Sequence, residues 1–207
     1  MQPRETEVSI PMLKESAKTY PGLILIGLMG SGKSSLGRRL AAHLNLPLID
    51  LDATIVAKSG LSIPEIFAQQ GETEFRKLET GALRETIAQH AVIATGGGVV
   101  LSKENRALLK GNNAPVVWLK ASPEFLANRI EGDTNRPLIA SGNTLRKLQE
   151  LSVVRDPFYE ECADFILPRD EMEKQQAMEE IVRFLIKQSN ALARSLGEVV
   201  KLWPGIL

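Results

Sequence analysis

Short apolar runs alternate along the chain with longer stretches in which apolar residues recur at helical spacing. The runs are strand-sized and continuously apolar, which indicates strands buried on both faces, as in a parallel sheet covered by helices. This pattern predicts an α/β fold. The expected strands span residues 23–26, 48–51, 92–95, 116–119 and 165–167.

Two of the expected helices carry clear start signals. Ser62 stands three residues before Glu65, which is the spacing of a capping box. Ser122 precedes Pro123, an N-cap residue followed by proline at the first helical position. Helices are therefore expected to begin directly after Ser62 and Ser122.

The chain is expected to contain one domain with an extension at each end. Its 207 residues fit a single domain of residues 21–187. Residues 1–20 contain Glu5, Glu7 and Glu15 and no apolar core segment, so they resemble neither a secretory signal nor a transit peptide. In residues 188–207, apolar residues at helical spacing favour a short helix docking on the domain, with a partner-binding helix as the alternative.

Residues 132–144 (GDTNRPLIASGNT) form a polar, turn-rich stretch without periodicity. Connections of this length within a compact domain are uncommon and often serve as lids over a binding site. We expect this loop to be a mobile lid.

Composition and charge exclude several classes of function. Hydrophobic residues make up 43% of the chain and charged residues 24%, which is ordinary globular usage. The 25 basic residues equal the 25 acidic ones, so the broad cationic field that attracts nucleic acid or an anionic membrane is not expected. No apolar run reaches the roughly 18 to 20 residues of a membrane span.

The cysteine and histidine residues fit a reducing compartment and no zinc site. Cys162 is the single cysteine, so the chain cannot form an internal disulfide. His43 and His90 are far apart and lie in no zinc-binding spacing. We expect a cytoplasmic protein.

The segment 27–34 (GLMGSGKS) directly follows the first expected strand and matches the P-loop pattern G-x-x-x-x-G-K-[ST] in full. Glycines at 27, 30 and 32 would let backbone N–H groups approach a triphosphate, while the following helix directs its positive end at the same phosphates. Lys33 would reach the β- and γ-phosphates, and the Ser34 hydroxyl would ligate Mg²⁺. A Rossmann motif is not matched, because Ser35 stands where its third glycine would be.

Polar residues follow several other expected strands, and in a parallel sheet the carboxyl ends of the strands share one edge with the P-loop. Asp50 and Asp52 end the second strand, two residues apart on what is expected to be extended chain. Because the third strand has no terminal Asp, Asp50 is the expected carboxylate that steadies Mg²⁺ and its waters, and Asp52 is expected to hold an acceptor hydroxyl. The alternative is that either one is a helix N-cap.

Three further segments are candidates for substrate contacts. Residues 71–79 (GETEFRKLE) form a charged helix start, whose alternative reading is an exposed helix with ion pairs. Gly96, Gly97 and Gly98 imply that some group approaches the main chain closely. Arg155 is either a substrate ligand or a surface charge.

Taken together, the segments GLMGSGKS, DLD, FRKLE, GGG, NRPL and RDPFYEECAD resemble shikimate kinase, a P-loop family related to the nucleoside monophosphate kinases. The similarity spans about residues 21–187. It implies a three-layer α/β/α fold with a five-stranded parallel sheet and a mobile lid. It also implies ATP-dependent phosphorylation of the 3-hydroxyl of shikimate, with Mg²⁺, in aromatic amino-acid biosynthesis.

The resemblance further implies a role for each site residue. Asp52 would hold the reacting hydroxyl, Arg76 and Arg155 would clamp the carboxylate, and Gly97 and Gly98 would offer backbone contacts. Asp50 would orient Mg²⁺ through water. Arg136 would close from the lid onto the phosphates. The nucleotide site would comprise Gly30, Ser31, Gly32, Lys33, Ser34, Ser35, Arg129, Arg136 and Pro168. Arg129 and the Pro168 region would flank adenine.

The residues alone also favour an acid with hydroxyl groups, because an arginine fork suits a carboxylate and an aspartate suits a hydroxyl. Two rivals remain: a gluconate or nucleotide kinase, which should lack this carboxylate clamp, and a ligand-sensing module of a transcription regulator. The latter needs a DNA-binding domain that twenty N-terminal residues cannot supply. We expect a monomer that binds shikimate and contacts neither nucleic acid nor a membrane.

Overall fold

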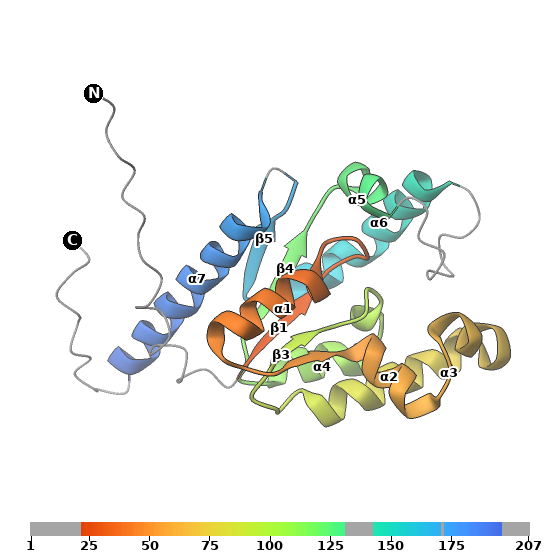
Figure 1. Cartoon of the computed structure of the whole chain (residues 1–207), viewed down its shortest axis with the longest axis horizontal. Coiled ribbons are helices and arrows are strands. Elements are labelled where there is room, and N and C mark those ends of the chain that lie inside the picture. Colours follow the sequence, from red (N-terminus) through yellow and green to blue (C-terminus); the bar gives the residue numbers. More distant parts are fainter. Residues whose placement is uncertain (1–21, 131–142, 171, 196–207) are drawn as a thin grey trace.

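A parallel sheet of five strands forms the centre of the computed structural model, which describes residues 22–130, 143–170 and 172–195 (Figure 1). The strands are β1 (Leu23–Ile26), β2 (Leu48–Asp50), β3 (Val92–Ala94), β4 (Val116–Lys120) and β5 (Phe165–Pro168). Their order is β2-β3-β1-β4-β5, and each neighbouring pair is parallel. Each predicted strand is confirmed to within one residue.

Helices cover both faces of this sheet. They are α1 (Lys33–Leu44), α2 (Leu51–Ser59), α3 (Ile63–Thr86), α4 (Lys103–Gly111), α5 (Pro123–Ile130), α6 (Thr144–Cys162) and α7 (Lys174–Ser195), with a short 3₁₀ turn η3 (Val99–Leu101) after β3. Figure 1 shows α1 and α7 together on one face, while α3, α4 and α6 lie on the other. The predicted three-layer α/β/α arrangement is confirmed.

Alternate residues of the central strand feed two separate cores. Leu23 and Leu25 pack with α1 and α7 on one face of the sheet, whereas Ile24 and Ile26 pack with the helices on the opposite face. All four are fully buried. Both faces of β1 are thus apolar, which explains why its sequence is a continuous apolar run.

Both predicted helix starts are confirmed. The Ser62 hydroxyl accepts a hydrogen bond from the Glu65 amide (3.4 Å), and the Glu65 carboxylate accepts one from the Ser62 amide (2.8 Å), which completes the capping box of α3. The Ser122 hydroxyl caps α5 by accepting from the Phe125 amide at 3.2 Å. Inside α3, Gly71 has φ 82° and ψ 170°, so the charged segment after it begins a fresh helical stretch.

Several expectations about the loop and the termini fall outside the described residues. These include the N-terminal extension, residues 132–142 of the expected lid and residues 196–207 of the tail. Helix α7 continues unbroken to Ser195, so the boundary drawn at residue 187 falls inside a helix. None of the helices described is long and apolar enough to cross a membrane.

Candidate active site

The P-loop connects β1 to α1 through backbone conformations that require glycine. Gly27, Gly30 and Gly32 have φ values of 137°, 82° and 99°, all in the region that L-residues avoid. A Cβ on Gly27 would come within 2.8 Å of the Leu119 carbonyl oxygen, and one on Gly30 within 2.7 Å of the Ile130 side chain. The loop's own packing therefore requires these glycines, in addition to any need for phosphate access.

Lys33, the first residue of α1, lies inside this loop. It is 8% exposed, and its Nζ donates to the carbonyls of Gly27 (2.7 Å) and Leu28 (3.0 Å). Gly32 is the N-cap of α1 and offers no side chain, which leaves the helix N-terminus open to an anion. Ser31 is fully buried and Ser35 partly buried beside this N-terminus. The geometry fits a phosphate cradle, and the contacts of these residues with nucleotide stay predictions.

Asp50, the last residue of β2, links this strand to α1 through a side-chain hydrogen bond with Ser34. One of its carboxylate oxygens accepts from the Ser34 hydroxyl at 2.6 Å, and the other accepts from the amides of Asp52 (3.1 Å) and Ala53 (3.2 Å). Asp50 is therefore the N-cap of α2 as well as a neighbour of Ser34. The expectation that Asp50 and Asp52 share an extended chain is wrong, because this cap starts the helix at Leu51 and places Asp52 in its first turn.

Of the three glycines after β3, Gly96 and Gly98 make room for side chains of the protein itself, whereas Gly97 packs against the main chain of the P-loop. A Cβ on Gly96 would lie 2.6 Å from Glu79 Oε1 and 3.0 Å from Asp52 Oδ1. A Cβ on Gly98 would overlap with the guanidinium of Arg76. The expected close approach to the main chain is therefore made by three polar side chains that converge on this turn.

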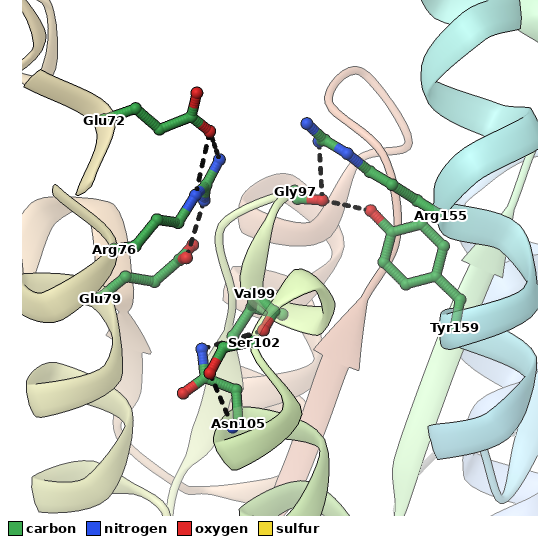
Figure 2. Close-up of polar contacts among 9 residues, drawn as sticks. All are labelled: Glu72, Arg76, Glu79, Gly97, Val99, Ser102, Asn105, Arg155 and Tyr159. Carbon is green, nitrogen blue, oxygen red and sulfur yellow. Dashed lines mark hydrogen bonds and ion pairs between the residues drawn. The ribbon is translucent and has the colours of Figure 1, made fainter.

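Arg76 is held by two acids of its own helix, as Figure 2 shows. Its Nη1 donates to Glu79 at 2.8 Å, while its Nη2 and Nε donate to Glu72 at 2.9 and 3.3 Å. Burial opposes the charge of Arg76, but the two carboxylates outweigh it and raise its pKa. The ion pairs expected for an exposed helix are therefore present, but the Arg76 side chain is only 18% exposed, so this part of the helix is not a solvated surface.

Glu79 is the most deeply buried acid of the site. The residue is 0% exposed, and its Oε1 lacks a hydrogen-bond partner in the part of the chain that the structure describes. Burial raises the pKa of Glu79, and the positive charge of Arg76 opposes that rise only in part. The carboxyl faces Asp52, whose negative charge raises the same pKa further.

Arg155 reaches the glycine turn from α6, on the side opposite Arg76 (Figure 2). It is 3% exposed and donates from Nη1 to the Gly97 carbonyl at 3.0 Å, so the surface-charge alternative is wrong. It forms no salt bridge within residues 22–130, 143–170 and 172–195. Burial lowers the pKa of Arg155, and the nearby charge of Arg76 lowers it further. Two guanidinium groups therefore face the same space above Gly97.

The other side of the P-loop is lined by the ends of β4 and β5. Arg129 of α5 is exposed and would lie 3.7 Å from a Cβ placed on Gly32. Pro168, the last residue of β5, is exposed next to Lys120 in the sheet. Arg169 follows it, 2% exposed, and the charge of Arg129 adds to burial in lowering its pKa. Contacts of Arg129 and Pro168 with adenine stay predictions.

Arg136 lies outside the described residues, and its contact with the phosphates stays a prediction. The last residues of the expected lid are described: Asn143 caps α6 by accepting from the Arg146 amide at 3.2 Å, and Thr144 begins that helix.

Comparisons with known proteins place these features in a family. The shikimate kinase family model matches residues 29–186. The chain belongs to the shikimate kinase family. A shikimate kinase of Neisseria meningitidis serogroup C is 48% identical over 150 residues, which cover 72% of this chain and 88% of the relative.

The similarity extends to solved structures. A shikimate kinase from Acinetobacter baumannii, solved in complex with shikimate, superposes with a TM-score of 0.74 at 35% identity. The match covers 91% of this chain and 99% of the other. A gluconokinase from Sinorhizobium meliloti matches with a TM-score of 0.50 at 22% identity, which shows a shared fold alone.

Sequence reasoning assigned no role to two residues that the structure places at the site. Glu79 stands three residues after Arg76 on one helix, a spacing that indicates an ion pair, but nothing in the sequence distinguishes a buried pair from an exposed one. Tyr159 lies four residues after Arg155, on the same face of α6. Its contact with Gly97, 62 positions away, depends on the tertiary fold.

Proposed function

We propose that this chain transfers the γ-phosphoryl group of ATP to the 3-hydroxyl of shikimate, giving shikimate 3-phosphate and ADP as a step of chorismate and aromatic amino-acid biosynthesis. Membership of the shikimate kinase family supports the activity. The structural observation that carries the substrate assignment is the pair of guanidinium groups, Arg76 and Arg155, on either side of Gly97. Such a pair suits a single carboxylate on a small acceptor.

On the acceptor side, the proposal uses the convergence of three groups. Arg76 keeps two N–H donors beyond those that Glu72 and Glu79 accept, and Arg155 is buried without an acid partner among the described residues. These donors bind the substrate carboxylate. Asp52, whose carboxylate lies against Gly96, accepts a hydrogen bond from the hydroxyl that attacks.

On the donor side, the N-terminus of α1 and the P-loop amides hold the phosphates. Lys33 gives part of its donor capacity to the β- and γ-phosphate oxygens, where its charge offsets the negative charge of the transition state. Arg129 and Pro168 flank the adenine, and Arg136 contacts the transferring group.

The Ser34 and Asp50 pair fits a magnesium ion bound largely by phosphates and water. Both groups offer oxygen ligands and already lie 2.6 Å apart. No cluster of three acidic, histidine or cysteine side chains suited to a metal occurs among the described residues, so the protein contributes few ligands. When bound, Mg²⁺ neutralises charge on the phosphates. Ser34 would ligate the ion, and Asp50 would orient its water.

The test is a coupled assay of ADP release with shikimate, gluconate and a nucleoside monophosphate as acceptors. We expect turnover with shikimate far above that with the others. The Lys33→Ala variant, purified identically, controls for a contaminating kinase. Turnover with gluconate or a nucleotide in preference to shikimate would overturn the assignment.

Chelation of divalent ions should abolish turnover and added Mg²⁺ should restore it. Light scattering tests the expected monomer.

A further inference from the structure

Tyr159 is a fully buried side chain of α6 whose hydroxyl points at the glycine turn (Figure 2). Its O–H donates to the Gly97 carbonyl, and its ring stacks on Trp118 of β4 with centroids 5.6 Å apart. Burial raises the pKa of Tyr159, so the phenol stays a neutral hydrogen-bond donor throughout the physiological range. The roles proposed above for the site residues make no use of it.

The Gly97 carbonyl accepts two donors at once, Tyr159 and Nη1 of Arg155. A carbonyl oxygen has two lone pairs, so both are occupied by groups of α6. Arg155 spends one of its five N–H donors here, and its buried Nε lacks a hydrogen-bond partner within the described parts of the chain. The other N–H groups of Nη1 and Nη2 are available to another acceptor.

This arrangement also fixes the amide that follows. In a trans peptide the N–H points opposite to the preceding C=O, and the described residues contain no cis peptide. With the Gly97 carbonyl directed toward Tyr159, the Gly98 N–H points to the other side of the turn. Arg76 lies on that side and packs against Gly98 so closely that a Cβ would overlap with it.

We propose that Tyr159 is a positioning residue of the acceptor site. Its phenol holds the Gly97–Gly98 peptide in the orientation that turns the Gly98 amide, together with the free donors of Arg76 and Arg155, toward the carboxylate of the acceptor. This inference rests on the proposed function, because that carboxylate is the group addressed. Without the phenol, the carbonyl keeps only its bond to Arg155, and the peptide is free to tilt.

The test compares Tyr159→Phe with Thr86→Val in steady-state kinetics. Phenylalanine keeps the ring on Trp118 and removes only the hydroxyl. We expect KM for shikimate to rise roughly 3- to 10-fold, as for loss of one buried hydrogen bond. We expect kcat and KM for ATP to change by less than about twofold. Thr86→Val is the matched control, because it removes a buried hydroxyl that donates to Ala82 O at 2.7 Å within α3.

An unchanged KM for shikimate in Tyr159→Phe would overturn the proposal, as would an equal rise of KM for ATP or the same effect in Thr86→Val. If the wild-type protein does not turn over shikimate, the proposed function and this inference both fall. Normal wild-type turnover with no KM effect in Tyr159→Phe overturns the inference alone.

A second measurement is independent of whether Tyr159→Phe folds. In wild-type protein labelled with ¹⁵N-glycine, saturation with shikimate should move the Gly98 amide proton downfield, because a carboxylate forms a strong hydrogen bond with it. A Gly98 resonance that does not move at saturation would overturn the proposal.

Discussion

Arg76→Lys keeps the positive charge of the acceptor site but removes the planar fork that the proposed carboxylate clamp needs. In the structure, three of the five N–H donors of Arg76 go to Glu72 and Glu79, which leaves one on each Nη for a ligand. A lysine has three donors on a single nitrogen. After pairing with the same two acids it keeps one donor and cannot bind a carboxylate through two parallel bonds.

The expected size of the effect follows from that count. A hydrogen bond to a charged group contributes about 1.5–3 kcal/mol. The lysine retains its charge, so the lower end of this range applies, and about 1.5 kcal/mol corresponds to a rise of at least tenfold in KM for shikimate. KM for ATP should change by less than about twofold, because an interaction confined to the acceptor does not contribute to nucleotide binding.

The measurement is ADP release with shikimate varied at saturating ATP, and then with ATP varied at saturating shikimate. Arg84→Lys is the matched control, because Arg84 lies on the same helix and pairs with Glu104 at the surface with 60% of its side chain exposed. It should leave both KM values unchanged. Equal rises of both values in Arg76→Lys, or a rise in neither, would place Arg76 outside the acceptor site and refute the clamp.

Two further substitutions test the catalytic assignments. Lys33→Ala should lower kcat by at least about 100-fold with the fold intact, since it removes a charge that stabilises the transition state; near-normal turnover would contradict its role. Asp52→Asn should lower kcat by roughly 10² to 10⁴, since it keeps the shape but removes the charge that receives the hydroxyl proton. Wild-type kcat in the Asn variant would show that Asp52 has no role at the reacting hydroxyl. The helix cap of α2 is not affected by this substitution, because Asp50 supplies it.

The parts of the fold that local signals determine were predictable from the sequence. Continuous apolar runs mark β1, β3 and β4 because their apolar residues are buried in the cores on the two faces of the sheet, and capping residues mark the starts of α3 and α5. The expectation of burial on both faces is wrong for the two edge strands, because β2 is half-buried and Ile166 of β5 is exposed. The end of β2 was less well predicted. The Asp50 side chain can either continue a strand edge or cap a helix, and its bonds to the Asp52 and Ala53 amides settle that choice in three dimensions.

Burial of charged side chains was the part of the site that the sequence did not reveal. From the sequence, Arg155 fits a surface charge as well as a substrate ligand, because its burial depends on the glycine turn 58 positions away. Glu79 likewise belongs to a helix whose pattern of ion pairs is typical of an exposed surface. Both become distinguishable only in the fold, where Gly96 leaves room for the Glu79 carboxyl and the Gly97 carbonyl accepts from Arg155.

The burial of Glu79 predicts how the stability of the protein depends on pH. The direction of that dependence shows whether burial or the charge of Arg76 has the stronger effect on the pKa of this carboxyl. Burial raises its pKa above the ordinary 4.5. The folded state then binds more protons than the unfolded state as pH rises from 4.5 toward the folded pKa, so Glu79 lowers the free energy of unfolding progressively across that window.

Glu79→Gln removes this titration. The stability of the variant minus that of the wild type, measured by urea unfolding, should therefore increase with pH above 4.5 and level off beyond the folded pKa. KM for shikimate should rise as well, because a neutral amide holds the Arg76 guanidinium less firmly. If the stability difference instead decreases with pH, the charge of Arg76 outweighs burial and Glu79 is an ordinary ion-pair partner with a lowered pKa.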